Sequence, residues 1–300
     1  MTIKHIVISG GGPPGIIAYG VYKALEKEGF WNIKDIKSIY GCSMGAILSV
    51  FLILNYKWEW LDDYLMKRPW NELVNVDPND MFNIYNTCGI VDKQVIYNLL
   101  SPLLKGKNLS EKLTMLELYE FTKIDMHIFS TNMNAPLMEK IDISHKTYPN
   151  IPVYEAIYMS STIPGIFKPI CDGEKCYIDG GFMSNFPIND CIEYQDANEK
   201  EVLGVIVASG RDNNITNISS LPNIYFGLMM KMISFVNQAE MFGKEYKPNI
   251  IECSPENTGG LMDWWYILED ESKRCRLIGQ GEKTGLEFLK KINYKDESKN

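Results

Sequence analysis

Ser43 lies between Gly41 and Gly45 in the pattern G-x-S-x-G, which has the spacing of a nucleophile elbow. Residues 37–40 suit a short buried strand, and residues 44–56 form an apolar run of helical length. Glycine on both sides of a serine lets a strand reverse directly into a helix, because the two segments can then pass close together. The sequence therefore predicts a serine nucleophile at a sharp turn. A tight turn with a helix-capping serine is the alternative.

A glycine-rich turn follows the first predicted strand, residues 3–9, and contains Gly10, Gly11, Gly12 and Gly15. A predicted helix begins within this turn. Backbone N–H groups of successive glycines near a helix N-terminus point outward, which suits an anion or a developing oxyanion. The turn is the second feature that can take part in chemistry.

The same turn also fits the dinucleotide-binding pattern G-x-G-x-x-G, with Asp35 as the ribose ligand. Two observations count against a nucleotide. Pro13 and Pro14 remove two backbone donors where a pyrophosphate would need them, and Asp35 precedes the second strand instead of ending it. A purely structural turn is the remaining alternative.

Asp179 follows a short predicted strand and is itself followed by Gly180 and Gly181. Two residues without side chains beside a carboxylate allow another backbone or a substrate to approach it closely. Taken alone, an Asp-Gly pair favours a simple hairpin turn.

A serine nucleophile needs a base, and histidine is the usual one. The α/β-hydrolase order would require Asp63 or Asp92 followed by His127 or His145. In that fold several strands precede the nucleophile, whereas here one strand and one helix do. The third histidine, His5, lies like His127 within a strand pattern.

The triad is therefore the less favoured hypothesis, and a carboxylate acting directly on the serine is the other. Asp179 can serve as that base if burial raises its pKa.

The composition limits the function classes. The chain has 300 residues, 45% of them hydrophobic, and a net charge of −8, which argues against a nucleic-acid partner. The first eight residues read as a strand and not as a signal peptide, and no apolar run is long enough to span a bilayer. We expect a cytoplasmic protein, for which any contact with a membrane would be peripheral.

The seven cysteines are scattered without the paired spacings of a zinc site. We expect free thiols. Cys171 and Cys176 bracket an Asp-Gly turn, where two thiols are favoured over a disulfide.

The remaining pattern shows no repeat or linker, so we expect one domain over residues 1–293 and a polar tail over residues 294–300. Periodicity predicts further helices at residues 92–104, 110–120, 154–161, 225–242 and 279–291, and further strands at 125–131, 203–208 and 248–253.

The three motifs, in this order and with these separations, resemble those of the patatin-like phospholipase family. Two weaker blocks agree, residues 129–132 and the serine- and proline-containing segment 160–169, and so do Asn185 and Pro187. The resemblance extends over roughly residues 3–289. It implies a three-layer α/β/α sandwich with a mainly parallel central sheet, and a Ser-Asp dyad that hydrolyses acyl esters of lipids without a metal or other cofactor.

Carried onto this sequence, the resemblance implies Ser43 as the nucleophile that forms an acyl-enzyme and Asp179 as its base. The N–H groups of Gly11 and Gly12, with that of Met44 as a further donor, would stabilise the oxyanion.

One position departs from the family pattern. Pro14 stands where members commonly have arginine or lysine; it fits the first turn of a helix but supplies neither the charge nor the N–H. A patatin-like binding protein without turnover, and a transacylase with the same acyl-enzyme, are the alternative functions. The expected partner is a phospholipid, lysophospholipid or acylglycerol.

The methionine-rich residues 221–236 are predicted to form a buried helix, with an acyl-chain wall or an interfacial patch as the alternative.

Overall fold

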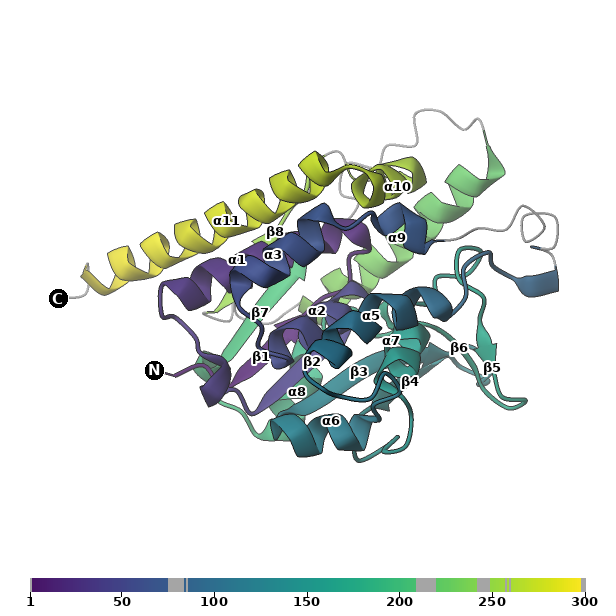
Figure 1. The fold of residues 1–300 in the computed structure, drawn as a ribbon, viewed down its shortest axis with the longest axis horizontal. Helices are drawn as coiled ribbons and strands as arrows, with labels where there is room; N and C mark the ends of the chain where they lie inside the picture. The colour runs from purple at the N-terminus through teal and green to yellow at the C-terminus, as the bar shows by residue number, and fades with distance from the viewer. Residues whose placement is uncertain are drawn as a thin grey trace.

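The computed structural model describes residues 2–74, 84, 86–208, 220–241, 249–256, 258 and 260–297, without the side chains of residues 293–297. In this part of the chain a mixed sheet of eight strands forms the centre of the molecule (Figure 1). The strands are β1 (His5–Ile8), β2 (Ser38–Cys42), β3 (Asp125–Asn132), β4 (Glu139–Ile143), β5 (Ile170–Cys171), β6 (Cys176–Asp179), β7 (Val202–Val207) and β8 (Ile250–Cys253).

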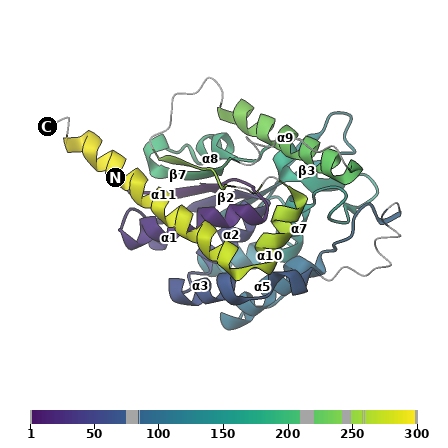
Figure 2. The ribbon, with the colours of Figure 1, turned by 90° about the horizontal axis from the view of Figure 1, so that it is seen from above.

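Helices cover both faces of this sheet. They are α1 (Ile17–Lys27), α2 (Met44–Ile53), α3 (Trp58–Lys67), α5 (Gln94–Gly106), α6 (Met115–Thr122), α7 (Val153–Ser161), α8 (Ile188–Gln195), α9 (Leu221–Met241), α10 (Leu261–Glu269) and α11 (Glu271–Glu297). Short 3-10 helices are η1 (Pro13–Ile16), η2 (Ile33–Asp35), η3 (Trp70–Leu73), η4 (Gly180–Phe182) and η5 (Glu199–Glu201). Seen from above, α8 and α9 lie on one face, and α1, α2, α3, α5 and α11 lie on the other (Figure 2). The predicted three-layer α/β/α fold is confirmed.

Strands β3, β2, β1, β7 and β8 are neighbours in this order and are parallel. They are buried on both faces, as parallel strands covered by crossover helices must be. In β1, for example, Ile6 and Ile8 pack into the core beneath α1 and α2, whereas Val7 points to the opposite core with Tyr40 and Phe186.

The two edges of β3 are used differently, and this arrangement positions the candidate site. β4 pairs antiparallel with one edge of β3, so that both β2 and β6 must pair with the other. β2 ends with Cys42 opposite Phe129, and β6 ends with Asp179 opposite Ser130, the next residue of β3. The two strands therefore meet end to end.

Two helices, α6 and α11, differ most from the predicted ranges. α6 begins at Met115 and not near Ser110, because the Thr114 hydroxyl accepts from the Glu117 N–H and the Glu117 carboxylate accepts from Thr114, forming a capping box. The last helix is also longer than predicted. α11 starts at Glu271 and continues to Glu297, into the tail expected from residue 294; residues 298–300 of that tail lie outside the described residues.

α11 packs along α1, although the two helices are far apart in the sequence (Figure 1). Glycines permit the close approach: a Cβ at Gly20 would lie 2.1 Å from the carbonyl oxygen of Ile278, and one at Gly281 would lie 2.0 Å from that of Ile17. The chain's two ends are thereby packed together.

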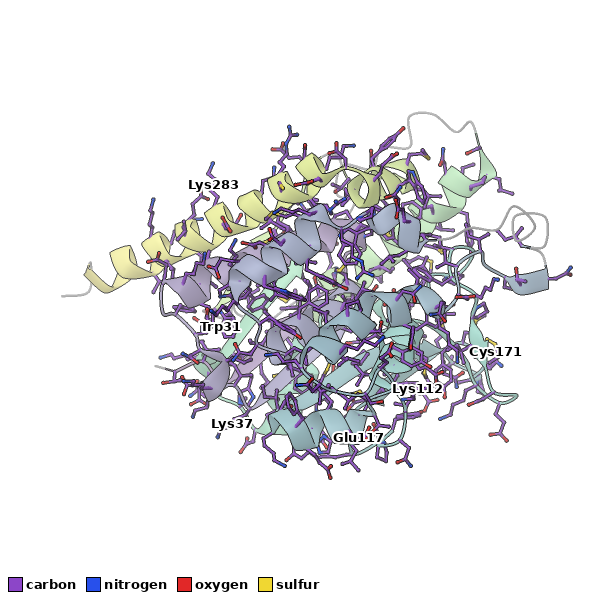
Figure 3. All side chains as sticks on the ribbon, in the orientation of Figure 1. Trp31, Lys37, Lys112, Glu117, Cys171 and Lys283 are labelled. Carbon is purple, nitrogen blue, oxygen red and sulfur yellow. A yellow bond between two sulfur atoms is a disulfide. The ribbon has the colours of Figure 1, made fainter. Side chains whose placement is uncertain are left out.

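The expectation of free thiols is wrong for one pair. In the β5–β6 hairpin Cys171 is opposite Cys176, and the structure joins them in a disulfide. Figure 3 shows Cys171 at one margin of the molecule. The other five cysteines, all within the described residues, form no disulfide.

Among the described helices, none combines the length and the hydropathy that crossing a bilayer requires.

Candidate active site

Ser43 lies at the junction of β2 and α2, with φ 51° and ψ −121°. A positive φ is strained for a residue with a side chain, and the turn holds it in that state. The flanking glycines make the turn possible. A Cβ at Gly41 would lie 2.7 Å from the carbonyl carbon of Gly45, and one at Gly45 would lie 2.2 Å from the carbonyl oxygen of Ile8. The structure thus has the strand, sharp turn and helix that the sequence predicts here.

A buried serine from α7 holds this turn in place. The backbone N–H of Ser43 donates to Oγ of Ser160 at 2.8 Å, and the Ser160 hydroxyl donates in turn to the carbonyl oxygen of Phe129 in β3. Ser160 belongs to the segment 160–169 that resembles the family pattern, but the sequence pattern assigns this residue no role of its own. Its contact with Ser43 spans 117 residues, so no local pattern could reveal it.

Asp179 ends β6 and is 1% exposed. Its Oδ1 accepts from the N–H of Gly181 at 2.8 Å and lies 3.9 Å from Sγ of Cys42. Within the described part of the chain, no group hydrogen-bonds its Oδ2. Burial raises the pKa of Asp179 from 3.8 to about 6, while the Gly181 N–H, the Ser43 side chain and the Cys42 thiol oppose that rise.

The Ser43 and Asp179 side chains are neighbours because of the sheet register. Their interaction lowers the pKa of Asp179, but Oδ2 has no hydrogen bond of normal geometry. Gly180 lets the two chain segments meet: a Cβ there would lie 2.1 Å from the carbonyl oxygen of Phe129 and 2.9 Å from Sγ of Cys42. A free carboxylate oxygen beside a hydroxyl is the arrangement that general-base activation needs.

The glycine turn lies on the other side of the serine. A Cβ at Gly10 would be 3.2 Å from that of Ser43, and the Gly10 N–H donates to the carbonyl oxygen of Asn185 at 3.1 Å. Among the described residues, nothing accepts a hydrogen bond from the N–H groups of Gly11, Gly12 or Met44. In the part of the chain that the structure describes, these three donors are therefore not used by another acceptor.

The dinucleotide alternative does not fit this arrangement. The glycine turn follows the end of β1, whereas Asp35 ends η2, before the start of β2. Because β1 and β2 are parallel, the start of β2 lies at the opposite end of the sheet from the turn. Pro13 and Pro14 occupy the first turn of η1, as expected for a residue with no N–H to donate.

The histidines have partners of their own. His127 is fully buried between two carboxylates, which together raise its pKa to about 9 although burial alone would lower it. None of the three contacts Ser43 in the described part of the chain: His5 hydrogen-bonds Ser38, His127 pairs with Asp125 and Asp142, and His145 pairs with Asp125.

Side chains from two later helices cover the site. Trp264 of α10 lies against the glycine turn, so that a Cβ at Gly12 would be 2.3 Å from its ring. Ile233 of α9 is 3.2 Å from the position that a Cβ of Gly181 would take. Ser43 itself is only 6% exposed. A cavity of about 260 Å³ lies elsewhere, with Tyr40, Asp142, Asp190, Glu193 and Tyr194 as its lining.

Comparisons with known proteins identify relatives of this chain. The sequence profile of the family described as patatin-like phospholipase matches residues 6–192. A probable lipid hydrolase of Invertebrate iridescent virus 6, 463L, is 28% identical over 206 residues, which are 68% of this chain and 69% of the viral protein. The uncharacterized protein YqhO of Bacillus subtilis strain 168 is 26% identical and covers 96% of this chain and 98% of its own length.

Among solved structures, VipD from Legionella pneumophila superposes with a TM-score of 0.54. The sequences are 17% identical, and the match covers 97% of this chain and 67% of VipD. At this identity the likeness establishes the fold alone.

Proposed function

The chain belongs to the patatin-like phospholipase family, and we propose that it is a lipid acyl hydrolase that works through an acyl-enzyme on Ser43, in one domain spanning residues 1–293. One observation carries this proposal. Asp179 is a buried carboxylate whose Oδ2 has no hydrogen-bond partner among the described residues, and it lies beside a serine that the backbone holds at a positive φ.

In the acylation step, Asp179 accepts the hydroxyl proton of Ser43 while Oγ attacks the ester carbonyl carbon. The N–H groups of Gly11, Gly12 and Met44 stabilise the resulting oxyanion; the loss of one such donor typically costs about 3 kcal/mol of barrier. The tetrahedral intermediate then collapses. The leaving alcohol takes the proton from Asp179, and the acyl group stays on Ser43.

In the deacylation step, Asp179 takes a proton from water as the water oxygen attacks the acyl-enzyme. Collapse of the second intermediate returns the proton to Ser43 and releases the fatty acid. A pKa of about 6 suits both steps, because the carboxylate is ionised at neutral pH and yet more basic than an exposed aspartate.

The proposed substrates are phospholipids, lysophospholipids or acylglycerols. The relative 463L is named a probable lipid hydrolase, which agrees with this class. Apolar side chains also lie against the two turns beside the dyad, Trp264 at Gly12 and Ile233 at Gly181, and such groups suit an acyl chain better than a sugar or a peptide.

A lipid-binding protein without turnover is the second candidate. The contact of Trp264 with Gly12, together with the 6% exposure of Ser43, favours it, because the nucleophile is buried and an aromatic ring lies against the turn that holds two of the donors.

The test is hydrolysis of a dissolved chromogenic medium-chain ester by the wild type, Ser43→Ala and Asp179→Asn, with a chelator present. We expect turnover by the wild type, loss of about a thousandfold or more in each variant, and labelling of Ser43 by a fluorophosphonate. Activity of Asp179→Asn equal to wild type would exclude the direct Ser-Asp mechanism. An inert wild type that still binds lipid would support the second candidate, and acyl transfer to an added alcohol in place of water would identify a transacylase.

A further inference from the structure

Helix α9 has two apolar faces, and the inner one belongs to the candidate site. Phe226, Met229, Met230 and Ile233 are buried in a cluster that also contains Trp264. Ile233 approaches Gly181, the residue whose N–H donates to Asp179. The inner face of this helix therefore forms part of the covering of the dyad.

The C-terminal part of α9 is attached to the same loop by polar contacts. Asn237 accepts from the side chain of Asn185 at 3.0 Å, and the Glu240 carboxylate accepts from the Ser184 hydroxyl at 2.7 Å and from the Phe186 N–H at 2.9 Å. These bonds fix how the helix lies over the segment that follows Asp179.

The outer face of α9 is a continuous apolar stripe. Leu221, Tyr225, Leu228, Met232 and Phe235 follow each other at intervals of three or four residues, which places them on one side of the helix. They are 78%, 46%, 55%, 44% and 72% exposed, respectively. The expectation of a buried helix is therefore correct for only one face, since five large apolar side chains of the other face contact water.

Helix α9 carries very little charge. From residue 221 to residue 239 Lys231 is the only charged side chain, in a chain whose net charge is −8. Carboxylates are thus absent from the stripe. In Figure 2, α9 runs along the margin of the molecule.

We infer that the outer stripe of α9 (Leu221, Tyr225, Leu228, Met232 and Phe235) docks the protein on a zwitterionic lipid surface. This inference rests on the proposed function, because an enzyme whose substrate lies in a lipid surface must bring its dyad there. The helix that carries the stripe is also the one that covers the dyad. A second copy of the chain on this face would enclose the site further and keep it from the lipid.

The charge distribution specifies the kind of lipid surface. Because Lys231 is the only cation of α9, the helix gains little from anionic head groups, and the negative charge of the whole chain opposes them. Apolar insertion must supply the binding, as it does for interfacial helices with a wide apolar face. Neutral phosphatidylcholine is consequently the right probe.

The test measures binding separately from turnover. The full chain carrying Ser43→Ala is sedimented with phosphatidylcholine vesicles, alone and with Leu228→Glu or Phe235→Glu. Each carboxylate should lower the partition coefficient by about tenfold or more, because it replaces an inserted apolar side chain with a charge. Phe121→Glu is the matched control, since this side chain is 51% exposed on α6, which lies well apart from α9 in Figure 1, and the variant should bind as the parent does.

Two further measurements keep the inference separate from the proposed function. With Ser43 intact, the α9 variants should hydrolyse the dissolved ester at the wild-type rate and lose hydrolysis of vesicle lipid. Vesicle binding by a wild type that is inert on the dissolved ester would refute the proposed function and leave the docking surface standing. Equal vesicle binding by all variants would overturn the inference, as would a dimer by sedimentation equilibrium that Phe235→Glu dissociates without any change in vesicle binding.

Discussion

Sγ of Cys42 lies 3.9 Å from Oδ1 of Asp179, so the residue before the candidate nucleophile contacts the candidate base. Burial and the neighbouring carboxylate raise the pKa of Cys42 well above its ordinary value, which keeps the thiol protonated and able to donate. Because a thiol is a weak donor, its contact with Asp179 offsets only part of the rise in pKa that burial causes.

Replacing this thiol should change the pH dependence of turnover. Activity requires ionised Asp179, so kcat/KM on a dissolved ester should rise with pH through about 6. Cys42→Ala removes a donor to the carboxylate and should move that midpoint upward, whereas Cys42→Ser supplies a stronger donor and should move it downward. Cys253→Ala, at another buried thiol, should leave the midpoint unchanged. Identical profiles for all four proteins would show that Cys42 does not influence the base.

Asp179→Asn should stabilise the fold while it abolishes turnover. The pKa of Asp179 is about 6 in the folded state against 3.8 ordinarily, so the folded protein binds the proton more tightly than the unfolded chain. Ionisation therefore destabilises the fold, with no penalty below pH 3.8 and the full penalty above pH 6. At about 1.4 kcal/mol per pH unit the penalty is about 3 kcal/mol.

Denaturant unfolding of wild type and Asp179→Asn at pH 4 and pH 8 measures this difference. The variant should be more stable at pH 8, and the two proteins should be nearly equal at pH 4. A variant less stable than wild type at pH 8 would mean that the ionised carboxylate is stabilised in the fold, and burial would not explain its pKa.

His127→Gln should lower stability and leave turnover of the dissolved ester intact. Asp125 and Asp142 raise the pKa of His127 to about 9 despite its burial, so its charged form stabilises the fold. With a folded pKa above the unfolded one, this stabilisation is complete below pH 6.5 and disappears as the pH rises through 9. It amounts to about 3 kcal/mol.

Thermal or denaturant unfolding at pH 6 and pH 10 should therefore show a large loss for His127→Gln at pH 6 and a small one at pH 10. Turnover is measured at about 20 °C, on protein that circular dichroism shows to be folded. Loss of turnover in a folded variant would revive the histidine triad and count against Asp179 as the base.

Gly12→Ala should disturb the glycine turn more than its backbone angles alone would predict. Gly12 has φ 56° and ψ −158°, a conformation that residues with a side chain almost never adopt, and its Cβ would collide with Trp264. Strain of this kind costs about 1–3 kcal/mol, and displacement of the ring adds to it. We expect a lower melting temperature and loss of turnover.

Gly29→Ala is the matched control, because Gly29 has φ 75° but open space around its Cβ position. This variant should lose only the stability that backbone strain at a positive φ costs, and it should keep wild-type turnover. Equal effects of the two substitutions on melting temperature and turnover would show that Trp264 does not constrain the turn.

The local features of the site follow from the sequence by itself. Two glycines around Ser43, a buried strand before it and an apolar run after it indicate a strand-turn-helix, because a reversal this tight admits no larger neighbours. Runs of apolar residues likewise identify β3 and β7 within a residue of their ends. These are properties of a few consecutive residues, and local conformational preference determines them.

The tertiary structure alone decided which of these features meet. Asp179 reaches the site because β6 pairs antiparallel with the part of β3 that β2 leaves free, a choice that involves residues 137 positions apart. The support of Ser43 by Ser160 and the exposure of one face of α9 were decided in the same way. Strand pairing and helix packing depend on the whole core, because the local pattern of an apolar stripe does not specify which surface it will pack against.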